Sequence, residues 1–109
     1  IDDWENKINT LLSVAPKRVD QATPLISFYL KTANDQGIKR LCDKIEKSGY
    51  YQGYCDLTLG SVLLKEGNFD KGMMLINRAE VNGVLNSSDI DEETAKNLKK
   101  LLKIYKNSN

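Results

Sequence analysis

The chain has 109 residues, of which 40% are hydrophobic and 28% are charged, and its formal net charge is +1. These proportions are typical of a small globular protein, and we expect a single domain over residues 1–109. The near-zero net charge gives neither a basic field that would attract nucleic acid nor an acidic field that would attract cations. No apolar run approaches the roughly 20 residues that a membrane-spanning helix needs. Because the chain begins with Ile1 rather than Met, we expect a processed or excised piece, in which the lack of a signal peptide carries no information.

Apolar residues at helical spacing predict three helices in the first half of the chain. The first is expected over residues 2–15, before Pro16, with Trp4, Ile8, Leu11 and Leu12 on one face. The second lies between residues 19 and 33, beginning either at Thr23 with Pro24 in the first helical position or nearer Lys17. Residues 34–37 read as a turn. The third helix is expected over residues 38–47, with Ile38, Leu41, Cys42 and Ile45 inward.

Three more helices are expected in the second half, so the fold class is all-α with about six helices. Residues 51–65 and 69–82 form a helical hairpin joined at Glu66-Gly67-Asn68. The sixth helix covers residues 90–106, with Asp89 as N-cap and Glu92 in the capping-box position. Its inward residues are expected to be Leu98, Leu101, Leu102 and Tyr105.

A repeat-type spacing covers the hairpin. Asp56-x2-Leu59-Gly60-x2-Leu63 is followed by Gly67-Asn68-Phe69 and by Gly72-x3-Ile76-x2-Ala79. This pattern resembles the tetratricopeptide repeat, most clearly over residues 53–86, in which small residues let two helices approach and larger ones fill the remaining space. The identities depart from the family pattern at five positions, namely Asp56 for Trp, Leu63 for Tyr, Gly72 for Ala, Ile76 for Phe and Val84 for Pro.

The resemblance implies a right-handed solenoid of helical hairpins that acts as a protein-binding scaffold. A shift of 34 residues places Leu25 under Leu59, Tyr29 under Leu63 and Cys42 under Ile76, so the second and third helices form a weaker copy of the repeat. The first and sixth helices would then cap the ends of the solenoid. The alternative is an irregular six-helix bundle with one accidental match.

The helix over residues 51–65 carries two apolar stripes, although one stripe is enough to attach a helix to its neighbours. The first stripe is Cys55, Leu59, Val62 and Leu63, and the second is Tyr54, Leu57, Ser61 and Leu64. Because the first helix of each repeat lines the concave groove in the resembled family, the predicted partner-binding residues are Tyr54, Leu57, Ser61, Leu64 and Lys65, with Thr23, Ser27, Leu30 and Lys31 from the weaker copy. Such a groove suits a peptide or helix with apolar anchors. The alternative is that the first or sixth helix folds over the second stripe and covers it.

Two cysteines bear on the cellular compartment. Cys42 and Cys55 are equally far from the Ser48-Gly49 turn, so an antiparallel helix pair would bring them to the same level. A disulfide would place the protein in a periplasm or outside the cell, whereas two buried thiols would be compatible with the cytoplasm. A metal site is not expected, because two cysteines without histidine cannot complete a four-ligand shell of soft ligands.

The chain offers little for catalysis. It has no histidine, the commonest general base, and no glycine-rich phosphate loop. The lysines near the end of the chain follow acidic residues on the same helix, an order that the helix dipole favours without any nucleic-acid partner. We therefore expect no enzyme and no cofactor, but an adaptor or chaperone that binds a protein or peptide. The alternative is a structural subunit of a larger assembly, such as a bacterial secretion or pilus apparatus.

Overall fold

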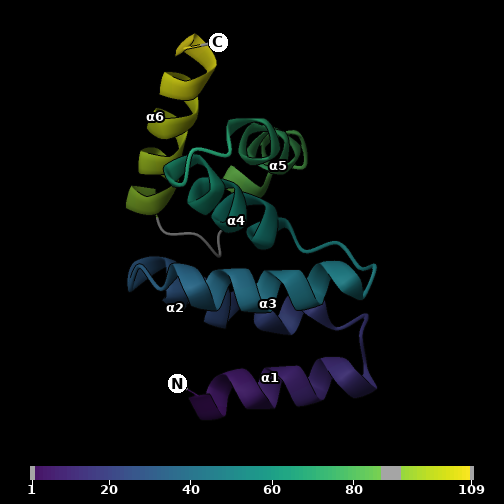
Figure 1. Ribbon diagram of the computed structural model, residues 1–109. Helices are drawn as coiled ribbons and strands as arrows, with labels where there is room; N and C mark the ends of the chain where they lie inside the picture. The colour runs from purple at the N-terminus through teal and green to yellow at the C-terminus, as the bar shows by residue number, and fades with distance from the viewer. Residues whose placement is uncertain (1, 87–91, 109) are drawn as a thin grey trace.

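The structure, a computed structural model, describes residues 2–86 and 92–108. The predicted all-helical class is confirmed for this part of the chain, which contains no strand. Its elements are α1 (Asp2–Val14), the 3-10 turn η1 (Val19–Ala22), α2 (Thr23–Lys31), α3 (Asp35–Lys47), α4 (Gly53–Lys65), α5 (Phe69–Val81), the 3-10 turn η2 (Val84–Asn86) and α6 (Glu92–Ser108). Helix α1 lies under the α2–α3 layer, and α4, α5 and α6 form the other half of the molecule (Figure 1).

Most predicted boundaries agree with these helices to within two residues, and the clearest difference is at the start of α3. The helix begins at Asp35, not at Ile38, because the side chain of Asn34 accepts a hydrogen bond of 2.9 Å from the backbone nitrogen of Gly37. An asparagine in this position caps a helix instead of closing a free-standing turn. The turn predicted at residues 34–37 is therefore wrong. The predicted cap Asp89 lies outside the described residues.

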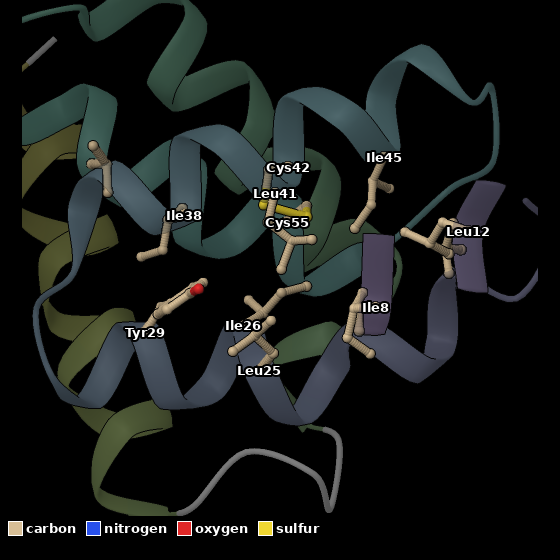
Figure 2. Packing of buried hydrophobic residues seen from close by; sticks show 13 residues of the cluster. Ile8, Leu12, Leu25, Ile26, Tyr29, Ile38, Leu41, Cys42, Ile45 and Cys55 are labelled. Atoms are coloured by element: carbon tan, nitrogen blue, oxygen red, sulfur yellow. A yellow bond between two sulfur atoms is a disulfide. The ribbon is translucent and has the colours of Figure 1, made fainter. Parts of the chain in front are cut away.

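The larger of two apolar clusters joins α1, η1, α2, α3 and one side of α4. Its fully buried members include Leu25, Ile26 and Tyr29 from α2 and Ile38, Leu41 and Ile45 from α3 (Figure 2). The predicted inward face of α1 is confirmed in part, since Ile8 and Leu12 join this cluster and Trp4 packs against it. The hydroxyl of Tyr29 also donates a 2.8 Å hydrogen bond to Glu5 of α1.

The second cluster joins α4, α5, η2 and α6. Its buried members are Leu57, Leu64, Ile76, Ala79, Val84 and Leu102. Leu102 confirms one of the four inward residues predicted for α6, while the side chains of Leu98, Leu101 and Tyr105 lie outside the described residues. Helix α4 therefore lies between the two clusters. One of its sides faces α2 and α3, and other sides face α5 and α6.

Helices α4 and α5 cross where two glycines meet, as the repeat-type spacing predicts. A Cβ atom added at Gly72 would lie 3.0 Å from the carbonyl oxygen of Gly60, and one added at Gly60 would lie 3.0 Å from the carbonyl oxygen of Gly72. Both contacts are tighter than a Cβ atom normally makes, so a side chain at either position would push the two backbones apart by a few tenths of an ångström. The two glycines thus allow the close approach of α4 and α5.

Candidate functional site

The second stripe of α4 is covered in this structure. Leu57, Ser61 and Leu64 expose only 1%, 6% and 2% of their surface. Val84 of η2 and Leu102 of α6 belong to the same cluster as the two leucines. The prediction that these three side chains line an open groove is wrong, because all three are buried; Leu102 of α6 contributes to the cover of the two leucines, as the alternative interpretation held in part.

The other predicted binding residues lie around this covered stripe. Tyr54 and Leu30 are half-buried and pack against the second cluster. Thr23 and Ser27 are also half-buried, while Lys31 and Lys65 are exposed, and Lys65 forms an ion pair of 3.2 Å with Asp35. These residues do not share one open groove, and the partner contacts proposed for them stay predictions.

The two cysteines are joined. Cys42 of α3 and Cys55 of α4 form a disulfide, with their Cα atoms 5.4 Å apart (Figure 2). The bridge closes the connection between the helices and holds the segment of residues 48–52 at one end of α4. This is the antiparallel, same-level arrangement that the spacing of the two cysteines from Ser48-Gly49 made possible.

Gln52 fixes the same segment through a second set of contacts, with η1 and α2. Its side-chain nitrogen donates to the carbonyl oxygen of Val19 at 2.7 Å and to the hydroxyl of Thr23 at 3.1 Å. Its side-chain oxygen accepts from the backbone nitrogen of Tyr54 at 3.0 Å and caps α4. A buried amide with these partners is satisfied and resists displacement. The neighbouring Tyr50 and Tyr51 are thereby presented to solvent, with 47% and 50% of their surfaces exposed.

A charged pair lies beside the tyrosines. Arg78 of α5 donates two hydrogen bonds of 2.7 Å to the two carboxylate oxygens of Asp56, a buried residue of α4. Its guanidinium carbon lies 6.0 Å from the centre of the Tyr51 ring. The hydrogen bond to Asp56 raises the pKa of Arg78, and burial together with the charge of Asp56 raises the pKa of Tyr51. At neutral pH this corner therefore holds a fixed ion pair and a protonated phenol.

An open groove runs between α3 and α5, with α4 as its floor; we call it the α3–α5 groove. It consists of two adjoining cavities of about 300 Å³ and about 390 Å³, which share Glu46 and Leu59. Its floor is Cys55, Leu59 and Leu63 of α4. Its walls are Lys39, Arg40, Asp43 and Glu46 of α3 and Lys71, Leu75 and Arg78 of α5. Tyr50 and Tyr51 close one end.

The composition of α4 explains why this groove has an apolar floor. Only Asp56 and Lys65 of its 13 residues are charged, so nearly every side of the helix needs a cover. Helices α2 and α3 cover one side, α5 a second, and η2 with α6 a third. Leu59 and Leu63, one helical turn apart, remain half-buried on the fourth side.

The sequence predicts both stripes, and their surroundings agree with the prediction in part. Cys55 and Val62 of the first stripe attach α4 to the larger cluster as predicted, Leu59 and Leu63 stay half-buried, and the second stripe is covered. The signal that could have corrected the predicted groove is the amphipathic α6, since a capping helix must bury its apolar face on the second stripe. The sequence places Tyr50 and Tyr51 together before α4, but it does not predict the Asp56–Arg78 pair beside them, because a pair between α4 and α5 depends on the rotation of both helices.

The described residues hold no cluster of three or more side chains suited to a metal ion. Within the same ranges, no helix is long and apolar enough to cross a membrane. The carboxylate of Asp56 is buried and paired with Arg78. What the α3–α5 groove offers is a shallow apolar surface with charges along its walls.

Comparison with protein-family models, with curated proteins and with solved structures finds no significant match for this chain. The resemblance to the tetratricopeptide repeat thus rests on the residues of the α4–α5 hairpin alone.

Proposed function

We propose that this protein is a non-catalytic interaction module that binds a segment of another protein in the α3–α5 groove. The observation that carries the proposal is the half-buried pair Leu59 and Leu63, which forms an apolar floor between two polar walls. Grooves of this kind bind helices through apolar side chains at intervals of three or four residues. The predicted adaptor or chaperone function is kept, while its site moves from one side of α4 to another.

The tyrosines at the closed end support the same proposal. Tyr50 and Tyr51 are half-exposed, and the disulfide and Gln52 fix the segment that carries them. A rigid aromatic side chain at an interface loses little conformational entropy when it binds, and tyrosine is enriched among residues that dominate binding energy. In this proposal the pair serves as a preformed anchor beside the apolar floor.

As to architecture, we propose that α2–α3 and α4–α5 are two tetratricopeptide-like hairpins of a short right-handed solenoid, with α1 and α6 as end caps. The glycine crossing of α4 and α5 and the packing of α4 against both α2 and α3 support this arrangement. In such a stack the groove between the second helices, α3 and α5, is a regular feature of neighbouring units.

As to the compartment, we propose a periplasmic or extracellular location. The support is the Cys42–Cys55 disulfide, because such bonds persist in oxidising compartments and are rare where glutathione and thioredoxin keep thiols reduced.

A structural subunit of a larger assembly is the second candidate. It is favoured by Met74 and Val81, which lie seven residues apart on the outer side of α5 and expose 53% and 85% of their surfaces. Light scattering of the purified chain separates the two: an adaptor is monomeric, whereas a subunit that docks permanently through this side self-associates or requires its partner to remain in solution.

Site-specific photo-crosslinking tests the proposed site. A photoreactive amino acid is placed at Leu63 in the groove or, as a control, at Thr10 on the exposed side of α1. In the native cells, position 63 should yield a discrete crosslinked protein that position 10 does not. Identical crosslinking patterns from both positions, or no product from position 63, would reject the groove as the binding site.

A further inference from the structure

We infer that the Cys42–Cys55 disulfide is a redox switch of the α3–α5 groove: the bridged chain binds its partner, and the chain with two free thiols stays folded but does not bind. This inference rests on the proposed function and adds its regulation. It comes from the place of the bridge beside the groove and from the unequal distribution of the bonds that join α3 to α4.

The bridge lies where one wall of the groove meets the floor. Both cysteines line the cavity at the closed end (Figure 2). On α3, Glu46 of the wall follows Cys42 by four residues, and on α4, Leu59 of the floor follows Cys55 by the same number. Residues at this spacing share one face of a helix and lie one turn apart. Because Glu46 and Leu59 are the residues that both cavities share, the bridge fixes the spacing of wall and floor where the cavities meet.

The bonds between α3 and α4 differ between the two halves of α3. In the first half, Asp35 forms an ion pair of 3.2 Å with Lys65 of α4. Lys39 pairs with Glu66, which directly follows α4. Within residues 2–86 and 92–108, no ion pair and no side-chain hydrogen bond joins residues 41–47 of α3 to α4, and the disulfide is the bond that connects the two helices there.

Opening the bridge therefore acts on one end of the groove. Leu41 and Ile45 remain buried in the larger cluster, which keeps α3 folded in its layer, and the ion pairs remain at the other end of the helix. Only apolar packing then fixes the distance between the second half of α3 and α4, so Glu46 and Leu59 lose their fixed spacing. A partner must order this wall before it can contact wall and floor together, and that ordering costs affinity.

The switch works by thiol–disulfide exchange with a dithiol reductant. A thiolate of the reductant attacks Sγ of Cys55, the S–S bond breaks, and Sγ of Cys42 leaves with the electron pair. The second thiol of the reductant attacks the mixed disulfide and releases Cys55, so the reductant becomes a disulfide and its two protons end on the two cysteines. Cys55 is the more accessible residue, because it exposes 7% of its surface and Cys42 exposes 1%. A disulfide oxidant of the proposed compartment reverses the exchange and closes the bridge.

Two spin-label distances in the purified full chain test the structural step. The labels are attached through keto-bearing residues, which leaves the cysteines unmodified. One label replaces Asn77 of α5, and the other replaces Lys44 in the second half of α3 or, as the control, Gln36 in its first half; all three positions are exposed. Helix α5 reports on α4 because the two cross closely at their glycines.

Replacing both cysteines by alanine should broaden the 44–77 distance distribution at least about twofold, because the second half of α3 can then open locally. The 36–77 distribution should stay unchanged. Equal broadening of both distributions, no broadening of either, or loss of the helical circular dichroism in the alanine pair would overturn the inference, which requires a folded chain that loosens at one end.

Photo-crosslinking from position 63 in the native cells tests the functional step. We expect the alanine pair to lower the yield of the crosslinked protein at least about tenfold relative to the bridged chain. Ile8→Ala is the matched control, because Ile8 is buried on α1 and does not line the groove. Its replacement destabilises the fold and leaves the bridge intact, so the crosslinked protein should still form.

The failure of the switch and the failure of the proposed function give different results. An equal yield from the alanine pair and the bridged chain overturns the switch and leaves the proposed function intact. Loss of the product with Ile8→Ala as well assigns the loss to lower stability and also overturns the switch. No product from the bridged chain rejects the proposed function, and the switch with it.

Discussion

Replacing Gly72 by a larger residue should separate α4 from α5 and weaken the fold. The Cβ atom of alanine at this position would lie 2.9 Å from Cδ2 of Leu64 and 3.0 Å from the carbonyl oxygen of Gly60. Leu64 can shift by a few tenths of an ångström, but the oxygen belongs to the backbone of α4 and moves only with that helix. The two helices must therefore move apart, and the second cluster loses contact.

The size of the effect follows from two opposing contributions. Overpacking of this kind costs about 1–3 kcal/mol. Removing a glycine from a helix interior returns up to about 1 kcal/mol. We expect Gly72→Ala to lower the free energy of unfolding by about 1 kcal/mol and Gly72→Leu, with three further carbon atoms against Leu64, by about 3 kcal/mol.

Urea denaturation followed by circular dichroism measures both changes against the unsubstituted protein. Asn77→Ala is the control, because Asn77 is exposed on the same helix and its replacement should raise stability by about 0.5 kcal/mol. If Gly72→Ala gains stability as the control does, the close crossing of α4 and α5 is not present and the repeat-type interpretation of this hairpin fails.

Three further outcomes follow from particular contacts. Reduction of the Cys42–Cys55 disulfide, or its replacement by two alanines, should cost about 3 kcal/mol of stability. Thiol titration of the denatured, unreduced protein should find no free thiol. Two titratable thiols in native material would contradict the bridge. Arg78→Ala should cost about 1–3 kcal/mol of stability, because it leaves the buried carboxylate of Asp56 unpaired while half of the Arg78 side chain is already exposed. Lys47→Ala removes a surface ion pair and should cost under about 0.5 kcal/mol. Equal losses would refute this distinction between the buried and the surface pair. Burial and the hydrogen bond to Glu5 raise the pKa of Tyr29 from 10.0 to about 12. Between these two pH values the unfolded state loses a proton that the folded state keeps, so the free energy of unfolding falls as pH rises. Tyr29→Phe should make this alkaline loss of stability shallower, and an unchanged slope would contradict the explanation.

How far the sequence predicts this structure can be seen in α4. The period of its apolar residues predicts the helix, and the Leu59-Gly60 pair predicts its close partner α5, because both signals are local. Its low charge content also predicts that several sides are covered. Which neighbour covers which side depends on where α6 folds back, and the spacing of residues on α4 contains no information about that.

Local chemistry decides the other agreements and differences. The equal distances of Cys42 and Cys55 from their turn made a bridge possible, since a short turn between antiparallel helices fixes which residues lie opposite. The sequence at residues 34–37 predicts a turn, although asparagine serves equally as a helix cap, and only the hydrogen bond to Gly37 distinguishes the two. The pairing of Asp56 with Arg78 joins residues 22 positions apart and could not be predicted from spacing.

The adjacent leucines Leu63 and Leu64 test the central claim most directly, because they differ in surroundings but not in kind. Leu63 lies half-buried on the floor of the α3–α5 groove, whereas Leu64 exposes 2% of its surface in the second cluster. For each Leu→Gln variant we would measure the free energy of unfolding and the capture of the protein crosslinked from position 63. We expect Leu63→Gln to lose under about 1 kcal/mol of stability and to abolish capture, and Leu64→Gln to lose at least about 2–5 kcal/mol. A Leu63→Gln variant that still captures the partner, or a Leu64→Gln variant as stable as the unsubstituted protein, would contradict the account.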